Sequence, residues 1–133
     1  AEVAAAVGAF VRFNWNDGRT EIMSYTDVDL SLAAGLSING ASWNRPKDTV
    51  GIAGAFNSIS GDHANYLAAG GLGITVGDGA LSYATEFVAE AYYSMHVAKG
   101  VYLTADYQFL ANPAYNLVRG PVHVFAGRLL ARF

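Results

Sequence analysis

The decisive stretch is Glu86-Phe-Val-Ala-Glu-Ala-Tyr-Tyr-Ser-Met-His-Val-Ala98, followed after Lys99-Gly by Val101-Tyr-Leu-Thr-Ala-Asp-Tyr-Gln-Phe-Leu-Ala111. Every second residue is apolar in both halves, and the residues between them are mostly small or polar. An alternation of this kind is typical of a β-strand with one apolar face. The short connection at 98–100 predicts that the two strands run antiparallel.

The same alternation occurs in other parts of the chain. It predicts strands near residues 4–15, 25–39, 48–59, 84–97, 101–111 and 122–133. Repeated segments of about ten residues, each with one apolar face, are the signature of transmembrane β-strands. We therefore expect an all-β fold in which residues 1–133 form a single transmembrane antiparallel β-barrel segment of about six strands.

The composition agrees with a membrane protein. Of the 133 residues 53% are hydrophobic and only 14% are charged, whereas soluble domains have about 25% charged residues. Disordered chains combine low hydrophobicity with high charge, so disorder is excluded. A nucleic-acid partner is not expected, because the net charge is -3 and the chain has no cluster of Lys and Arg. The longest apolar stretches are too short or too polar for a spanning helix, which needs about 20 residues.

A soluble β-sandwich would also alternate, but two features argue against it. The polar face is mostly Gly, Ala and Ser, whereas a water-facing strand is usually rich in Lys, Glu and Thr. The connections also alternate in length, short at 39–47 and 98–100, and longer at 16–24, 60–82 and 112–121. Bacterial outer-membrane barrels have short periplasmic turns and long extracellular loops. This parity places the C-terminus, which ends in Phe133, on the periplasmic side of the outer membrane.

Six strands raise a difficulty, because closed barrels of this type have at least eight. An open sheet leaves unpaired edges in lipid, which is energetically forbidden. Either a further strand lies near 66–76, or the chain is one piece of a larger barrel. We prefer the second interpretation, since one extra strand would break the parity.

Several motifs resemble those of the carbohydrate-selective outer-membrane porins, the porin B family. They are Trp43-Asn-Arg45 with Asp48-Thr-Val-Gly-Ile-Ala-Gly54, Tyr66-Leu-Ala-Ala-Gly-Gly-Leu-Gly73 with Gly77-Asp-Gly79, and Asp106-Tyr-Gln-Phe-Leu-Ala-Asn-Pro113 with Arg119-Gly-Pro121. The resemblance implies that this chain is the C-terminal part of a sixteen-stranded barrel. It also implies passive conduction of sugars, glucose above all, with no enzyme activity and no cofactor.

The residues between the apolar positions are candidates for the lining of a pore. A neutral sugar needs alternating donors and acceptors and an aromatic surface for its C–H groups. The candidate sugar-contacting residues are Arg12, Glu86, Glu90, Tyr92, Tyr102, Asp106, Gln108 and Arg128. We expect Glu90, Asp106 and Arg128 to belong to a polar ring at mid-height, with Tyr92 and Tyr102 as stacking surfaces. The alternative is that Arg128 and Asp106 form an ion pair that braces the wall.

Other chemistry finds little support in the sequence. Asp27-Val-Asp-Leu-Ser31 has the spacing of a calcium loop but lacks the required glycine. His63, His96 and His123 share no spacing typical of metal ligands, so no metal is expected. No nucleophile elbow is present. Aromatic residues near the predicted strand ends suggest girdles at the membrane interfaces; they are Trp15, Tyr25, Trp43 and Tyr93.

The expected partners are outer-membrane lipid and lipopolysaccharide, the remaining strands of the barrel and sugar solutes, with a homo-oligomer possible. The alternative function is that of a structural or adhesive outer-membrane β-protein that closes by association with other chains. Residues 60–69 could form a short helical turn that rests on the rim or enters the lumen.

Overall fold

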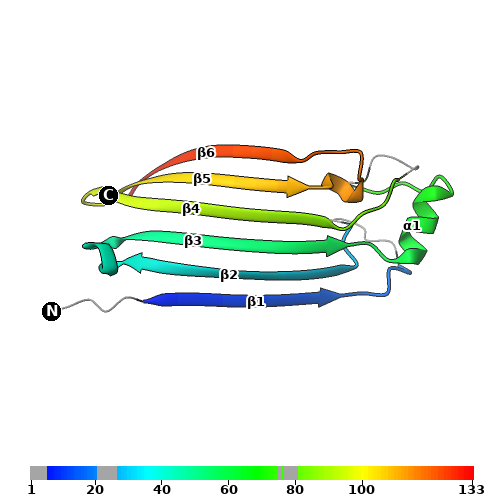
Figure 1. The fold of residues 1–133 in the computed structure, drawn as a ribbon, viewed down its shortest axis with the longest axis horizontal. Helices are drawn as coiled ribbons and strands as arrows, with labels where there is room; N and C mark the ends of the chain where they lie inside the picture. The colour runs from blue at the N-terminus through cyan, green and yellow to red at the C-terminus, as the bar shows by residue number, and fades with distance from the viewer. Residues whose placement is uncertain (1–5, 21–26, 75, 77–80) are drawn as a thin grey trace.

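The computed structural model describes residues 6–20, 27–74, 76 and 81–133. In this part of the chain six strands form one sheet (Figure 1). They are β1 (Val7–Trp15), β2 (Leu30–Gly40), β3 (Arg45–Ser58), β4 (Glu86–Ala98), β5 (Val101–Ala111) and β6 (Val122–Ala131). All neighbouring strands are antiparallel and follow one another in sequence order. The all-β prediction is therefore confirmed.

The strand limits differ from the predicted ranges at several ends, and the start of β3 has a local reason. β3 begins at Arg45, three residues earlier than expected, because the β2–β3 register shifts at Asn39/Gly40 and pairs Gly40 with Arg45. Asn44 closes the tight turn with a φ of 59°, a conformation that asparagine tolerates better than most residues. β2 begins at Leu30. The predicted strand residues 4, 5, 25 and 26, together with the motif at 77–79, lie outside the described residues.

The two ends of the sheet are different. The turn end carries the short connections at 41–44 and 99–100, and the loop end carries the long ones at 16–29, 59–85 and 112–121. The β4–β5 turn requires glycine at Gly100, where φ is +73° and a Cβ would lie 2.2 Å from the Arg132 carbonyl oxygen. Helix α1 (Gly61–Ala68) lies at the loop end, while the C-terminus lies at the turn end (Figure 1). The helical turn expected within 60–69 is thus α1.

The strand register divides the sheet into two faces. Along the row Ala9, Leu36, Ile52, Ala91, Tyr107, Phe125 every strand contributes an apolar or aromatic side chain to the same side. We call this side the apolar face, and its large side chains are exposed: Phe13 by 64%, Ile52 by 57% and Phe125 by 79%. The opposite side is the polar face, which carries the candidate pore-lining residues.

The hydrophobic core is small and lies at the loop end. The fully buried apolar side chains among the described residues are Ile59, Leu67, Val76 and Tyr115, with Val28, Ala64 and Leu81 packed around them. None of the core side chains belongs to a strand. A soluble sandwich would bury its apolar strand faces between two sheets, and this chain has one sheet with an exposed apolar face. Within the described ranges no helix is long and apolar enough to cross a membrane.

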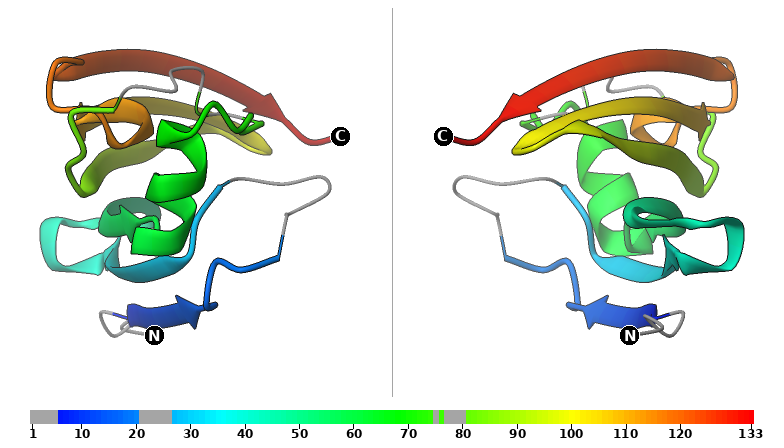
Figure 2. Two further views of the ribbon diagram at one scale, coloured as in Figure 1. Left: turned by 90° about the vertical axis from the view of Figure 1, so that its right-hand side faces the viewer. Right: turned by 90° about the vertical axis from the view of Figure 1, so that its left-hand side faces the viewer.

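The sheet is curved and open. Viewed along its long axis the strands trace an arc, with β1 and β6 at its two edges and α1 across its concave side at the near end (Figure 2, left). No pairing joins β1 to β6 in the part of the chain that the structure describes. The arrangement is that of a segment of barrel wall whose edges remain available for further strands.

Candidate pore-lining face

The register brings the candidate residues of β4, β5 and β6 together on the polar face. Glu90 pairs with Gln108, Tyr92 with Asp106, and Thr104 with Arg128. These pairs form three successive rows across the sheet. A hollow of about 480 Å³ lies over them and is lined by Thr49, Glu90, Tyr92, Ser94, Thr104, Asp106, Ala126 and Arg128. We call it the central hollow.

The central hollow combines both signs of charge with hydroxyl groups. Thr104 Oγ1 donates a hydrogen bond to Ser94 Oγ at 3.0 Å. Asp106 Oδ1 is buried and has no hydrogen-bond partner among the described residues. Arg128 and Asp106 line the same hollow, but no ion pair joins them in the described structure. The bracing pair that we considered as the alternative is therefore not formed.

Glu86 lies in a second hollow, of about 580 Å³, at the loop end of the polar face. Both of its carboxylate oxygens are engaged, since Asn57 Nδ2 donates to Oε1 at 3.1 Å and the Ala114 backbone N–H donates to Oε2 at 2.9 Å. Ser31 Oγ joins the same hydrogen-bond network, because it donates to Asn57 Oδ1 at 2.8 Å. This carboxylate therefore links β3 and β4 to the loop that follows β5.

The lining of the central hollow does not include the three remaining candidates, which are Gln108, Tyr102 and Arg12. Tyr102 pairs with His96 near the turn end, where their rings meet edge to face at 5.1 Å. Arg12 lies on β1 opposite Ala33. The row through Arg12 continues through Ala55, Val88, Leu110 and Val122, so the polar face is apolar along this line.

Phe10 was not among the predicted pore-lining residues, although it lies on the polar face. It pairs with Gly35, and the next rungs of the same row are Ala53, Glu90 and Gln108. Its position in the sequence alternation, between Gly8 and Arg12, could have assigned it to the polar face. The ring is 48% exposed.

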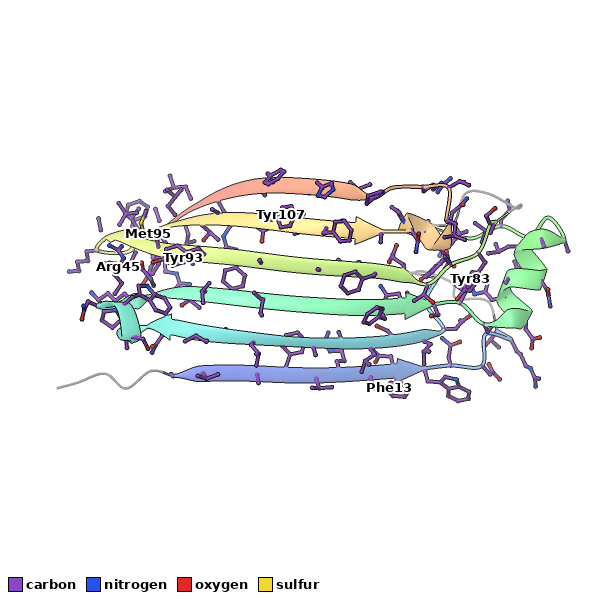
Figure 3. The ribbon with its side chains drawn as sticks, viewed as in Figure 1. Phe13, Arg45, Tyr83, Tyr93, Met95 and Tyr107 are labelled. Carbon is purple, nitrogen blue, oxygen red and sulfur yellow. The ribbon has the colours of Figure 1, made fainter. Side chains whose placement is uncertain are left out.

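A hydrogen-bonded cluster locks the turn end. Asp48 is 1% exposed and accepts hydrogen bonds from the Arg45 guanidinium, from the Tyr93 hydroxyl at 2.5 Å and from the His96 backbone N–H at 2.8 Å. Trp43 Nε1 donates to the Tyr93 hydroxyl at 3.2 Å. Figure 3 shows Arg45 and Tyr93 close together at this end. The Trp43…Asp48 motif therefore fastens the β2–β3 turn to β4.

A second cluster holds α1 at the loop end. Asp29 Oδ2 accepts a hydrogen bond from the Ser60 backbone N–H at 2.7 Å and lies 3.0 Å from His63 Nδ1. The Ser60 hydroxyl caps α1, because it accepts a hydrogen bond from the His63 backbone N–H. Asp29 has the same parity as Ser31 on the polar face. The helix consequently lies over the polar side of the sheet, at the rim.

Tyr115 anchors the loop that follows β5. Its hydroxyl donates to the Asp27 carbonyl oxygen at 2.5 Å, and its φ of 60° is a left-handed conformation that costs about 1–2 kcal/mol. Burial raises the pKa of Tyr115 well above its ordinary value, and the carboxylates of Glu86, Asp27 and Asp29 raise it further. The packed, hydrogen-bonded ring offsets the backbone strain.

Two of the aromatic residues predicted for the membrane girdles lie near strand ends. Trp43 is in the β2–β3 turn and Trp15 ends β1 at the loop end. Tyr93 lies inside β4, five residues before its end, and only its hydroxyl reaches Trp43. Tyr25 lies outside the described residues. His123 is a polar exception on the apolar face, and its Nδ1 is 2.8 Å from the Tyr107 hydroxyl (Tyr107 is labelled in Figure 3). No three His, Asp or Glu side chains in the described ranges come together as metal ligands.

Comparison with known families agrees with this geometry. The family model for the carbohydrate-selective porins, OprB family, matches residues 1–133. The chain belongs to this family. OprB porins are outer-membrane channels and not enzymes, so membership favours the channel over the structural or adhesive alternative. No match was found among curated proteins or solved structures.

Proposed function

We propose that this OprB-family chain forms part of the wall of a water-filled channel through which glucose-type sugars diffuse passively. In this proposal the polar face lines the lumen and the apolar face meets outer-membrane lipid. No free-energy source is required, because the channel only lowers the barrier to a solute that moves down its own gradient.

The observation that carries the proposal is the central hollow. It places carboxylates, a guanidinium, hydroxyls and an aromatic ring on the face opposite the exposed apolar residues. A sugar presents hydroxyl groups that both donate and accept, so a lining of mixed charge can replace its water hydrogen bonds without retaining it by a strong field of one sign. Pore-lining roles for Arg12, Gln108 and Tyr102 follow from their places on the same face.

The surroundings of the chain belong to the same proposal. Further strands pair with the free edges of β1 and β6 to complete a sixteen-stranded barrel, since unpaired edges are not tolerated in lipid. The turn end and the C-terminus face the periplasm, and the loop end faces the lipopolysaccharide.

The test is a liposome-swelling assay with the full-length porin. We expect glucose to enter the vesicles faster than a larger oligosaccharide does, without a proton gradient or nucleotide. Replacing Glu90 and Asp106 together by Gln and Asn should change the relative rates for sugars and ions, whereas Asp17→Asn, in the β1–β2 loop, should not. Vesicles that remain impermeable to glucose would contradict the proposal.

A further inference from the structure

A third hollow, of about 450 Å³, adjoins the central hollow on the polar face. Its polar-face lining is Gly8, Phe10, Gly35, Ser37, Ala53, Glu90 and Tyr92. Glu90 and Tyr92 line both hollows. The two hollows therefore adjoin, and together their lining residues come from every strand between β1 and β6.

Two aromatic rings line this third hollow, and each reaches over a glycine of the neighbouring strand. Phe10 reaches from β1 over Gly35 of β2, where a Cβ on the glycine would lie 2.5 Å from the ring. Tyr92 reaches from β4 over Gly51 of β3, where a Cβ would lie 2.4 Å from its ring. In both cases only glycine leaves room for the ring against the backbone.

The two glycines under the rings, Gly35 and Gly51, lie on the neighbouring strands β2 and β3 and are not directly opposite each other. Gly35 pairs with Ala53, and Gly51 follows two residues away and pairs with Ser37. With strands about 4.8 Å apart and about 3.4 Å per residue, the two glycines lie about 8 Å from each other. Between them the floor consists of small side chains and exposed backbone.

Phe10 is 48% exposed on the polar face and lines this hollow, so its ring is accessible to a ligand there. Lipid cannot cover the ring here, because Phe10 lies on the side opposite Phe13 and the other lipid-facing residues. The Glu90 carboxylate and the Ser37 hydroxyl line the same hollow. A ligand that suits this site has an apolar C–H surface on one side and hydroxyl groups at its margin, which describes a pyranose ring.

We propose that Phe10 and Tyr92 form an aromatic subsite that binds one pyranose ring of the passing sugar, with Glu90 accepting hydrogen bonds from its hydroxyls. The inference rests on the proposed sugar channel and deepens it. Gly35 and Gly51 are positioning residues, since they let the two rings lie against the sheet.

The test measures the ion current of the full-length porin in planar bilayers during titration with maltose. Phe10→Leu keeps an apolar side chain of similar size but removes the aromatic face. It should raise the half-saturating maltose concentration roughly 3- to 10-fold, the range typical of single aromatic contacts. Phe10→Tyr retains a ring and should keep the affinity.

Phe13→Leu is the matched control, because Phe13 lies on the same strand and faces the other side. It should leave the titration unchanged. Gly35→Ala should weaken binding as Phe10→Leu does, since the added methyl group displaces the Phe10 ring.

The outcomes separate the two proposals. If maltose reduces the current of the unaltered porin and Phe10→Leu gives the same titration, the aromatic subsite is wrong and the channel stands. If the unaltered porin conducts ions but no sugar affects or crosses it, both proposals fail.

Discussion

At the scale of the residue, Asp48 is the least exposed of the buried polar residues that the structure describes. Its carboxylate is buried and joins the turn before β3 to β4 through Arg45, Tyr93 and the His96 N–H. Asp48→Asn removes the charge and turns an amide group toward these donors, which we expect to cost about 1–3 kcal/mol.

The loss from Asp48→Asn should appear as a lower temperature at which the folded full-length porin converts to its unfolded form on heat-modifiability gels. Asp17→Asn, in the exposed β1–β2 loop, is the control and should not lower it. An unchanged transition in Asp48→Asn would show that the cluster adds nothing to the stability of the barrel.

Arg128 supplies the positive charge of the central hollow, beside Glu90 and Asp106. Arg128→Ala leaves the carboxylates uncompensated, so the channel should become more selective for cations. The reversal potential in a KCl gradient measures this directly. Lys99→Ala, in the β4–β5 turn, should have a smaller effect, and equal shifts for both variants would argue against Arg128 as a pore-lining charge.

At the scale of the element, α1 is held at the loop end by one buried leucine in addition to the cluster of Asp29, Ser60 and His63. Leu67 is 1% exposed and packs in the core with Ile59, Val76 and Tyr115. Leu67→Ala should cost about 2–5 kcal/mol locally and release α1 without unfolding the strands.

Limited proteolysis tests this prediction for Leu67→Ala. Cleavage within residues 59–85 should accelerate, while the strand fragments stay protected. Leu72→Ala makes the same chemical change at a side chain that is 84% exposed and should not accelerate cleavage. Equal rates for the two variants would mean that α1 is not held by its core.

The loop end should also respond to alkaline pH. Because the pKa of Tyr115 is raised by burial and by nearby carboxylates, the folded state favours the protonated phenol. This stabilisation is complete below the ordinary tyrosine pKa of about 10 and declines as the pH rises above it.

Proteolytic opening of residues 59–85 should therefore increase above about pH 10. The increase should be smaller in Tyr115→Phe, which cannot ionise. The loop end of that variant is less stable at every pH, because it lacks the hydrogen bond to the Asp27 carbonyl oxygen. A pH profile identical in both proteins would contradict the role of Tyr115.

At the scale of the whole molecule, closure is the main requirement. One curved sheet with an exposed apolar face and two unpaired edge strands needs partners for both edges in lipid. We expect the folded, detergent-solubilised assembly to have a protein mass well above the 14.0 kDa of these residues. A monodisperse species of 14.0 kDa with six strands would rule out the sugar channel.

Much of the architecture could be predicted from local pattern. Alternation along 86–111 assigned two strands and both faces, and the alternating lengths of the connections separated the turn end from the loop end. Four candidate residues, Glu90, Tyr92, Asp106 and Arg128, meet in one hollow because a regular register carries parity from strand to strand. Phe10 lies between Gly8 and Arg12 in the alternation and so belongs to the polar face. It was not predicted as a pore-lining residue because it is apolar.

The sequence by itself thus determined the strands, their two faces and the family, because these depend on a two-residue period and on contiguous motifs. Tertiary structure alone decided that both Glu86 oxygens are engaged, that Asp48 is buried under Arg45 and Tyr93, and that Phe10 and Tyr92 rest over glycines of other strands. Those facts depend on which distant residues the register places side by side. The two-residue period gives the face of each residue, but the register also depends on the geometry of the turns, such as the shift at Asn39/Gly40.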